Sequence, residues 1–210
     1  MASLLDSLRK KPGPAKAATA PSAAANGPSD ELRLGLFRVI IERYREEIEE
    51  HENKSVSDLK EMVLPHDPLI VKTRDSLLEG FRPYIYEEHF IAAAKMCCEY
   101  VSSFATISPP VAFWLTFSDM QSILAGDEID KSILLCSLLR SLGSPDARIF
   151  VTDTKNSYVL CSFWGKFHLS SHSGSAPAVC ESEQAAIAHM SGKPIYSFND
   201  RDYSALTEDE

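Results

Sequence analysis

The sequence predicts an α+β fold, with helices in the N-terminal half and a small antiparallel sheet packed on one buried helix in the C-terminal half. Three observations support this class. Apolar residues recur at helical spacing through residues 30–108. After residue 147 the apolar runs are short, rich in aromatic and β-branched residues, and bounded by turn residues. Between these parts, residues 127–142 form one strongly apolar helical pattern, which we expect to be the buried helix.

Residues 30–108 are expected to form four helices. The first begins at Ser29–Asp30 and extends to about Glu52, because apolar side chains repeat along one face of this stretch. The others are a short helix opened by Ser57–Asp58 and closed by Pro65, a helix from Asp67–Pro68 to Glu79, and a helix over about 87–103. Asp67–Pro68 is typical of an N-cap followed by the first helical residue.

Residues 109–198 are expected to form the core. A short helix opens at Thr116 and stops at Gly126. The buried helix then has Asp127 and Glu128 at its positive end and Gly143 just beyond its negative end. The expected strands are residues 148–152, 157–163 and 166–170, forming two short hairpins, and a short helix follows over about 181–190.

Both ends of the chain are expected to be flexible tails. Residues 1–29 are predicted to be disordered, because residues 12–29 hold almost no side chain that could offset the entropy lost on ordering. Leu4, Leu5 and Leu8 nevertheless give residues 1–11 an amphipathic tip. Two alternatives stay open for this tip, a disordered terminus and a segment that docks on an assembly. Residues 199–210 form an acidic tail.

Composition excludes several classes of function. The 210 residues carry a net charge of −9, which disfavours nucleic acid as the main partner. We expect no membrane span, because no apolar run approaches about 20 residues. The N-terminus lacks the apolar core of a secretory signal. Five Cys without a CxxC spacing favour reduced thiols and a cytoplasmic protein. No phosphate loop, dinucleotide fingerprint or zinc pattern is present, so we expect no cofactor and no metal.

Residues 113–171 resemble the core of the transglutaminase-like superfamily, which has the papain-type cysteine peptidase fold. The resemblance is carried by FWLTFSDMQSILAGDEIDKSILLCSLLRSLG and NSYVLCSFWGKFHLSS. In the family, Gly-Asp-Cys opens a buried helix, a catalytic His begins the next strand, and an Asp follows a Gly-Lys-Trp turn. The variant Gly-Asp-Glu, with Asp-Lys following, is similar to uncharacterised archaeal proteins.

All three positions of the family's catalytic triad are changed. The resemblance places Glu128 at the nucleophile, Asn156 at the general base, and Ser171 at the orienting Asp, or Ser170 if the register slips by one. A carboxylate does not perform the acyl transfer of a thiolate, and Asn accepts no proton near neutral pH. We therefore expect no Cys-dependent activity. Cys97, Cys98 and Cys136 are expected to be core residues.

The sequence thus predicts a catalytically inactive domain that binds a protein or peptide partner in the groove that its relatives use for substrate. Candidate binding residues are Trp114, Asp127, Asp130, Tyr158 and Trp164. Burial in the core is the alternative for Trp114. An enzyme of another class is the alternative function, with Glu128 and neighbouring carboxylates or His168 as acid–base groups or metal ligands. Against it, the helix dipole is expected to lower the pKa of the carboxylates at positions 127, 128 and 130.

Overall fold

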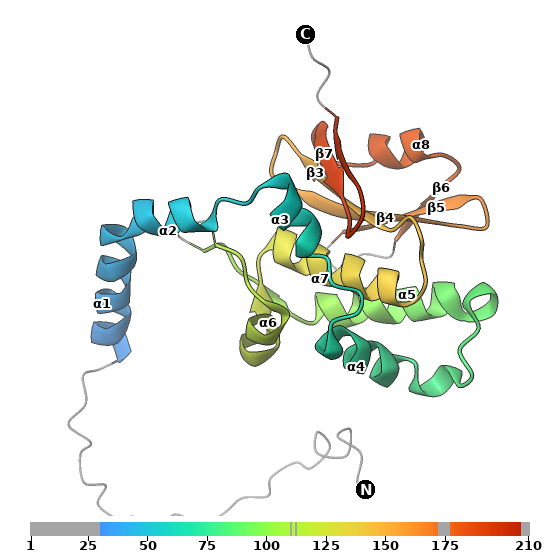
Figure 1. The fold of residues 1–210 in the computed structure, drawn as a ribbon, viewed down its shortest axis with the longest axis horizontal. Coiled ribbons are helices and arrows are strands. Elements are labelled where there is room, and N and C mark those ends of the chain that lie inside the picture. The colour runs from blue at the N-terminus through green and yellow to red at the C-terminus, as the bar shows by residue number, and fades with distance from the viewer. Residues whose placement is uncertain (1–29, 110, 112, 172–176, 207–210) are drawn as a thin grey trace, which may run out of the picture. The chain divides into compact units, whose positions relative to one another are not determined.

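The computed structural model describes residues 30–109, 111, 113–171 and 177–206 (Figure 1). The predictions for residues 1–29, including the amphipathic tip, lie outside these residues. The chain divides into two units, residues 1–40 and 41–210, and α1 (Asp30–Arg43) begins in the first of them. Of the helices that the structure describes, none is long and apolar enough to cross a membrane.

The single helix expected over residues 30–52 is two helices, because the backbone leaves helical geometry at Tyr44, with φ −106° and ψ 19°. The remaining N-terminal elements are α2 (Arg45–Glu52), α3 (Val56–Glu61), α4 (Pro68–Leu77), the 3₁₀ turn η2 (Glu79–Phe81) and α5 (Tyr86–Ser102). Helix α3 begins earlier than predicted, since Ser55 and Asp58 form a capping box. Helix α4 has Asp67 as its N-cap and Pro68 as its first residue, as predicted.

The expected buried helix is α7 (Glu128–Ser141), in which every residue from Asp130 to Arg140 is buried. It follows α6 (Phe117–Ile123), which is capped by a Thr116–Asp119 box. The short strands β1 (Ala105–Thr106) and β2 (Ala125–Gly126) pair in parallel beside these helices. Gly143, with φ +102°, follows the C-cap of α7, as the sequence predicted.

The antiparallel sheet is larger than the two hairpins that the sequence predicted. Its strands are β3 (Arg148–Thr152), β4 (Ser157–Phe163), β5 (Lys166–Ser171), β6 (Ala178–Cys180), β7 (Pro194–Phe198) and β8 (Tyr203–Ala205), in the order β6-β5-β4-β3-β7-β8. Helix α8 (Glu183–Ala188) lies inside the predicted range 181–190. Because side chains alternate along a strand, Val159 and Cys161 pack in the α7 core, whereas Leu160 packs in the cluster that contains Ala186 of α8. The predicted α+β architecture, one buried helix on a small antiparallel sheet, is confirmed.

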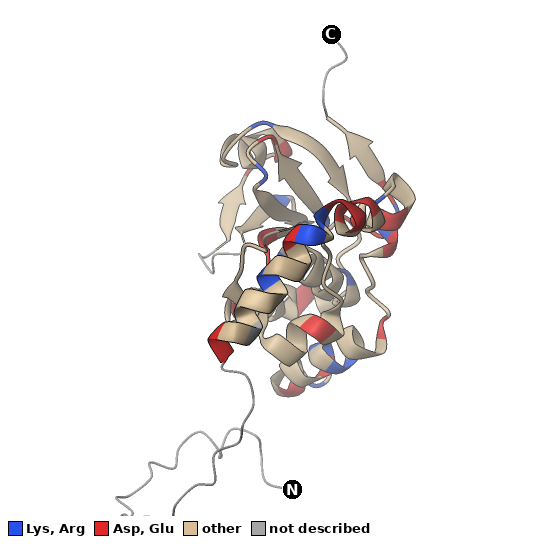
Figure 2. Cartoon of the chain, turned by 90° about the vertical axis from the view of Figure 1, so that its left-hand side faces the viewer, with Lys and Arg blue, Asp and Glu red and all other residues tan. Residues whose placement is uncertain are grey.

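Strand β8 falls in the segment that was expected to be an acidic tail. Leu206 donates its backbone N–H to the carbonyl of Ile195, at 2.8 Å, so the ladder continues to the end of the described chain. Asp200 accepts two hydrogen bonds from the buried Arg140 of α7, at 2.6 and 3.1 Å. The turn between β7 and β8 is therefore held by the central helix. Figure 2 marks both basic and acidic residues along the described elements, and α2, with the sequence REEIEEHE, is mainly acidic.

Candidate functional site

The first turn of α7 is built around two carboxylates. Asp127 is the N-cap, and its carboxylate accepts the backbone N–H of Asp130 at 2.8 Å. Asp130 in turn accepts the backbone N–H of Asp127 at 3.3 Å, which completes a capping box. Glu128 is the first helical residue. The two Asp residues thus satisfy orphan N–H groups of the helix start, the capping role that the sequence favoured.

Asp130 does not have the lowered pKa that its position at the helix start predicted. Its residue is only 2% exposed, and its carboxylate also accepts the backbone N–H of Leu115 at 3.2 Å. Burial, and after it the negative charge of Asp127, raise the pKa of Asp130 to about 7. Desolvation therefore outweighs the helix dipole and the accepted hydrogen bonds.

Lys131 connects the start of α7 to β1 and the residue before it. Its ammonium group donates to the carbonyl of Phe104 at 2.9 Å and to the hydroxyl of Thr106 at 3.1 Å. The side chain is buried, and this burial lowers its pKa. These bonds assign Lys131 a structural role at the helix start.

Strand β4 meets the first turn of α7 through Ser157. The Ser157 hydroxyl donates to the backbone carbonyl of Glu128 at 2.9 Å and lies 2.8 Å from the hydroxyl of Ser132. Asn156, the position that the resemblance assigns to the general base, instead donates its amide to Thr154 at 3.0 Å within the β3–β4 turn. Ser157 could not be assigned to this site from the sequence, because the face on which a strand residue lies depends on the strand's register, and a shift of one residue moves it to the other face.

The position that the resemblance assigns to the orienting Asp lies on β5. Ser171 pairs with Tyr158 and Ser170 pairs with Val159, so the two serines point to opposite faces of the sheet. His168 pairs with Cys161, four residues along β4 from Ser157, which corresponds to about 13 Å. The structure therefore separates His168 from the helix start that contains Glu128.

All five cysteines are buried. Burial raises the pKa values of Cys97, Cys98 and Cys136, and it raises the pKa of Cys161 to about 12. The predicted core positions of Cys97, Cys98 and Cys136 are confirmed. The first helical residue of α7, where a helix dipole would favour a thiolate, is Glu128.

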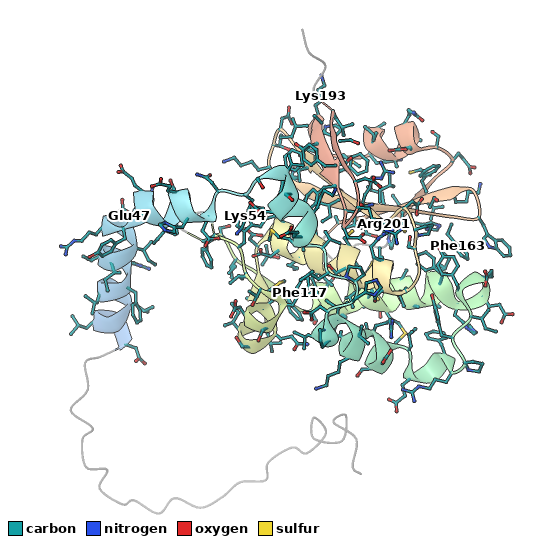
Figure 3. The ribbon with its side chains drawn as sticks, viewed as in Figure 1. Glu47, Lys54, Phe117, Phe163, Lys193 and Arg201 are labelled. Carbon is teal, nitrogen blue, oxygen red and sulfur yellow. The ribbon has the colours of Figure 1, made fainter. Side chains whose placement is uncertain are left out.

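Two cavities lie beside the start of α7, and we call them together the α7 groove. The larger has a volume of about 650 Å³ and the smaller about 270 Å³, and Lys54 and Trp114 line both. Besides Pro68 and Trp114, six apolar residues line the larger cavity, namely Met62, Leu64, Leu69, Leu115, Phe117 and Ile133. Asp127 and Tyr196 line the smaller one. Figure 3 shows Lys54 after α2 and Phe117 at the start of α6, which belong to segments far apart in the sequence.

Trp114 is half-buried between the two cavities rather than fully in the core. Its backbone N–H donates to the carboxylate of Glu52 at 3.0 Å, and its indole N–H donates to the Glu52 carbonyl at 2.9 Å. The end of α2 thus orients the ring. Lys54, Met62 and Leu69 also line the larger cavity. Their local sequence does not indicate a binding role, because they reach the groove through tertiary contacts alone.

The other two aromatic candidates lie away from the α7 groove. Tyr158 is on the face of the sheet that packs against α8, and its hydroxyl accepts the backbone N–H of Ser191 at 2.9 Å. Trp164 is 78% exposed in the β4–β5 turn and stacks on Phe163, with ring centroids 5.8 Å apart. Of the five candidate binding residues, only Trp114 and Asp127 line the groove.

No family model matches the sequence, and no curated protein matches it significantly. Among solved structures, the chain is similar to LapG from Legionella pneumophila. One LapG structure has 16% identity and a TM-score of 0.44, covering 65% of this chain and 87% of LapG. The calcium-bound form has 15% identity and a TM-score of 0.42, covering 67% and 90%. The EGTA-treated form of LapG has 14% identity and a TM-score of 0.42, covering 65% and 85%. At these values we transfer no residue role from LapG.

Proposed function

We propose that the chain is a catalytically inactive transglutaminase-like domain of the cytoplasm that binds a peptide or protein segment in the α7 groove. The observation that carries this proposal is the placement of Glu128 at the first position of α7, where the resembled family has its nucleophilic Cys. Because all five thiols are buried, none takes over that position.

The chemistry of the buried thiols supports the inactive state. A nucleophilic Cys needs an exposed sulfur and a lowered pKa, so that thiolate is present near neutral pH. Burial moves the pKa values of Cys97 and Cys136 in the opposite direction. A neutral thiol in the core serves as a small apolar group, so packing accounts for these residues.

The lining of the α7 groove supports binding. Recognition grooves combine apolar side chains that supply burial with a few polar groups that orient the ligand. In the α7 groove, six apolar residues and Trp114 supply the apolar surface. Lys54, Glu61 and Asp67 supply the polar groups. A half-buried Trp held by two hydrogen bonds is a rigid surface on which a partner side chain can stack.

A matched pair of variants tests this proposal. Peptides would be selected on the full-length protein from a random dodecapeptide library, and their affinities measured by fluorescence polarisation. Ser118 is exposed at the larger cavity of the groove, so Ser118→Trp should fill it and weaken peptide binding roughly tenfold or more. Ala94→Trp, in a different cavity, should leave the affinity unchanged. Equal binding by the Ser118→Trp variant, or no selected peptide, would contradict the proposal.

One observation favours the alternative of an enzyme of another class. The pKa of Asp130, raised to about 7, suits a general acid or base near neutral pH. The side chain is nevertheless buried, and it lines neither cavity of the groove. A thermal-shift and metal-content assay with divalent cations separates the two functions. A stoichiometric metal that is lost in Glu128→Gln would favour the enzyme and contradict the inactive domain.

A further inference from the structure

A separate cavity of about 340 Å³ lies between α5 and strands β4–β6. Phe90, Ile91, Ala94, Leu139 and Val179 make its lining predominantly apolar. Cys161 of β4 lines this cavity. It lies about 13 Å along the strand from Ser157, which contacts the start of α7, so the cavity is separate from the helix start. We call it the α5 pocket. It has no lining residue in common with the α7 groove.

Two polar side chains of β5, His168 and Ser170, line the α5 pocket. Ser170 is only 4% exposed, and its hydroxyl is hydrogen-bonded to the thiol of Cys98 at 3.5 Å. The ring of His168, two residues away on the same face, makes no hydrogen bond within the described chain. The half-buried His168 ring and the Ser170 hydroxyl therefore supply polar groups that can bond to a ligand's polar atom in an otherwise apolar lining.

The electrostatics of the α5 pocket favour an uncharged ligand. Lys95 and Glu99, which both line it, approach within 3.8 Å, so their opposite charges largely cancel at the rim. In the interior, burial lowers the pKa of His168 and raises the pKa of Cys98, which keeps both groups neutral. An ionic group would therefore lose its hydration without gaining a counter-charge.

We propose that the α5 pocket binds an uncharged, mainly apolar small molecule with one hydroxyl or carbonyl oxygen, which hydrogen-bonds to Ser170 and His168. The hydrocarbon part contacts Phe90, Ile91 and Val179. Because a cavity of about 150 Å³ accommodates benzene, the volume here suits a ligand with the size of two fused rings.

Calorimetric titration of the full-length protein with 1-naphthol tests the proposal, with naphthalene-1-sulfonate as the anion of matched shape. We expect 1-naphthol to bind and the sulfonate to bind at least about tenfold more weakly. Ala94→Trp, which fills the pocket from α5, should abolish binding, whereas Ser118→Trp in the α7 groove should not change it. Ser170→Ala should weaken binding by roughly fivefold, the effect of one lost hydrogen bond.

Absence of 1-naphthol binding, or unchanged binding by folded Ala94→Trp protein, would overturn the proposal. If circular dichroism shows that Ala94→Trp does not fold, the 1-naphthol affinity of Ser170→Ala is used instead. An unchanged affinity of that variant would contradict binding in the α5 pocket. Equal binding of the sulfonate would contradict the preference for an uncharged ligand. The test is independent of the peptide site, because the two cavity-filling substitutions have opposite expected effects on the two ligands.

Discussion

The buried carboxylate of Asp130 accepts a hydrogen bond of 3.2 Å from the backbone N–H of Leu115, and so joins the first turn of α7 to the segment that carries Trp114. Leu115 lines the larger cavity of the α7 groove, whereas Asp130 lines neither cavity. The position of the Trp114 ring is therefore coupled to Asp130 from one side and to Glu52 from the other. Titration of Asp130 should thus affect the stability of the domain and the shape of the groove.

We predict that Asp130 makes the protein less stable as the pH rises from about 4 to 7. Its pKa is about 7 in the folded protein and near 3.8 when unfolded, so the folded state binds more protons in this window. The stabilisation that results from the raised pKa of Asp130 is complete at pH values below its unfolded pKa of 3.8. It is lost as the pH rises through its folded pKa of about 7. Asp130→Asn should remove this part of the slope, measured by urea unfolding at several pH values.

The control for that measurement is Asp119→Asn. Asp119 is the equivalent carboxylate in the capping box of α6, but it is exposed. The pH slope of this variant is the reference with which the slope of Asp130→Asn is compared, since both variants make the same substitution at the third position of a capping box. If Asp130→Asn kept the wild-type slope, burial would not dominate the pKa of Asp130.

Helix α7 is predicted to be the most sensitive element to loss of side-chain volume. Leu138 is fully buried, so Leu138→Ala should lower the free energy of unfolding by about 3 kcal/mol through lost burial and the cavity that remains. Ile123 is 55% exposed at the end of α6, and Ile123→Ala should cost less than about 0.5 kcal/mol. Chemical denaturation of both variants checks this difference, and similar losses would contradict the central position of α7.

The ion pair between α7 and the β7–β8 turn gives a second stability prediction. The Arg140 side chain is only 4% exposed, and Asp200→Ala leaves its charge without a carboxylate. We expect a loss of roughly 3 kcal/mol in the free energy of unfolding. The exposed Asp202 is the control, since Asp202→Ala should have little effect in the same experiment. A small effect of Asp200→Ala would show that the turn contributes little to the fold.

Local signals in the sequence were sufficient for much of the helical structure. The cap at Asp67, the Thr116 start of α6 and the boundaries of α7 follow from side chains within a few residues of each helix end. Strands β6, β7 and β8 were missed, because three residues in β6 and in β8 give a weak pattern and β7 begins at Pro194, a residue that disfavours a strand assignment.

The candidate site was predictable only in part, for the same physical reason. The position of Glu128 at the helix start depends on local capping, and it was predicted. The contact between Ser157 and α7 depends on strand register, and the separation of Tyr158 and Trp164 from the groove depends on sheet alternation and strand length. The raised pKa of Asp130 depends on its burial in the folded protein, which the local sequence at the helix start does not indicate.

The reactivity of the five thiols tests the inactive state directly. Because all five cysteines are buried and burial raises the pKa values of four of them, we expect the native protein to react slowly with iodoacetamide at pH 7.5. Unfolding in guanidinium chloride should release all five thiols for rapid alkylation, which mass spectrometry would count. Glu128→Cys is the matched variant, since it places a thiol at the first position of α7, where the helix dipole favours the thiolate. This variant should gain one fast-reacting thiol, and a fast thiol in the wild type would contradict the proposed function.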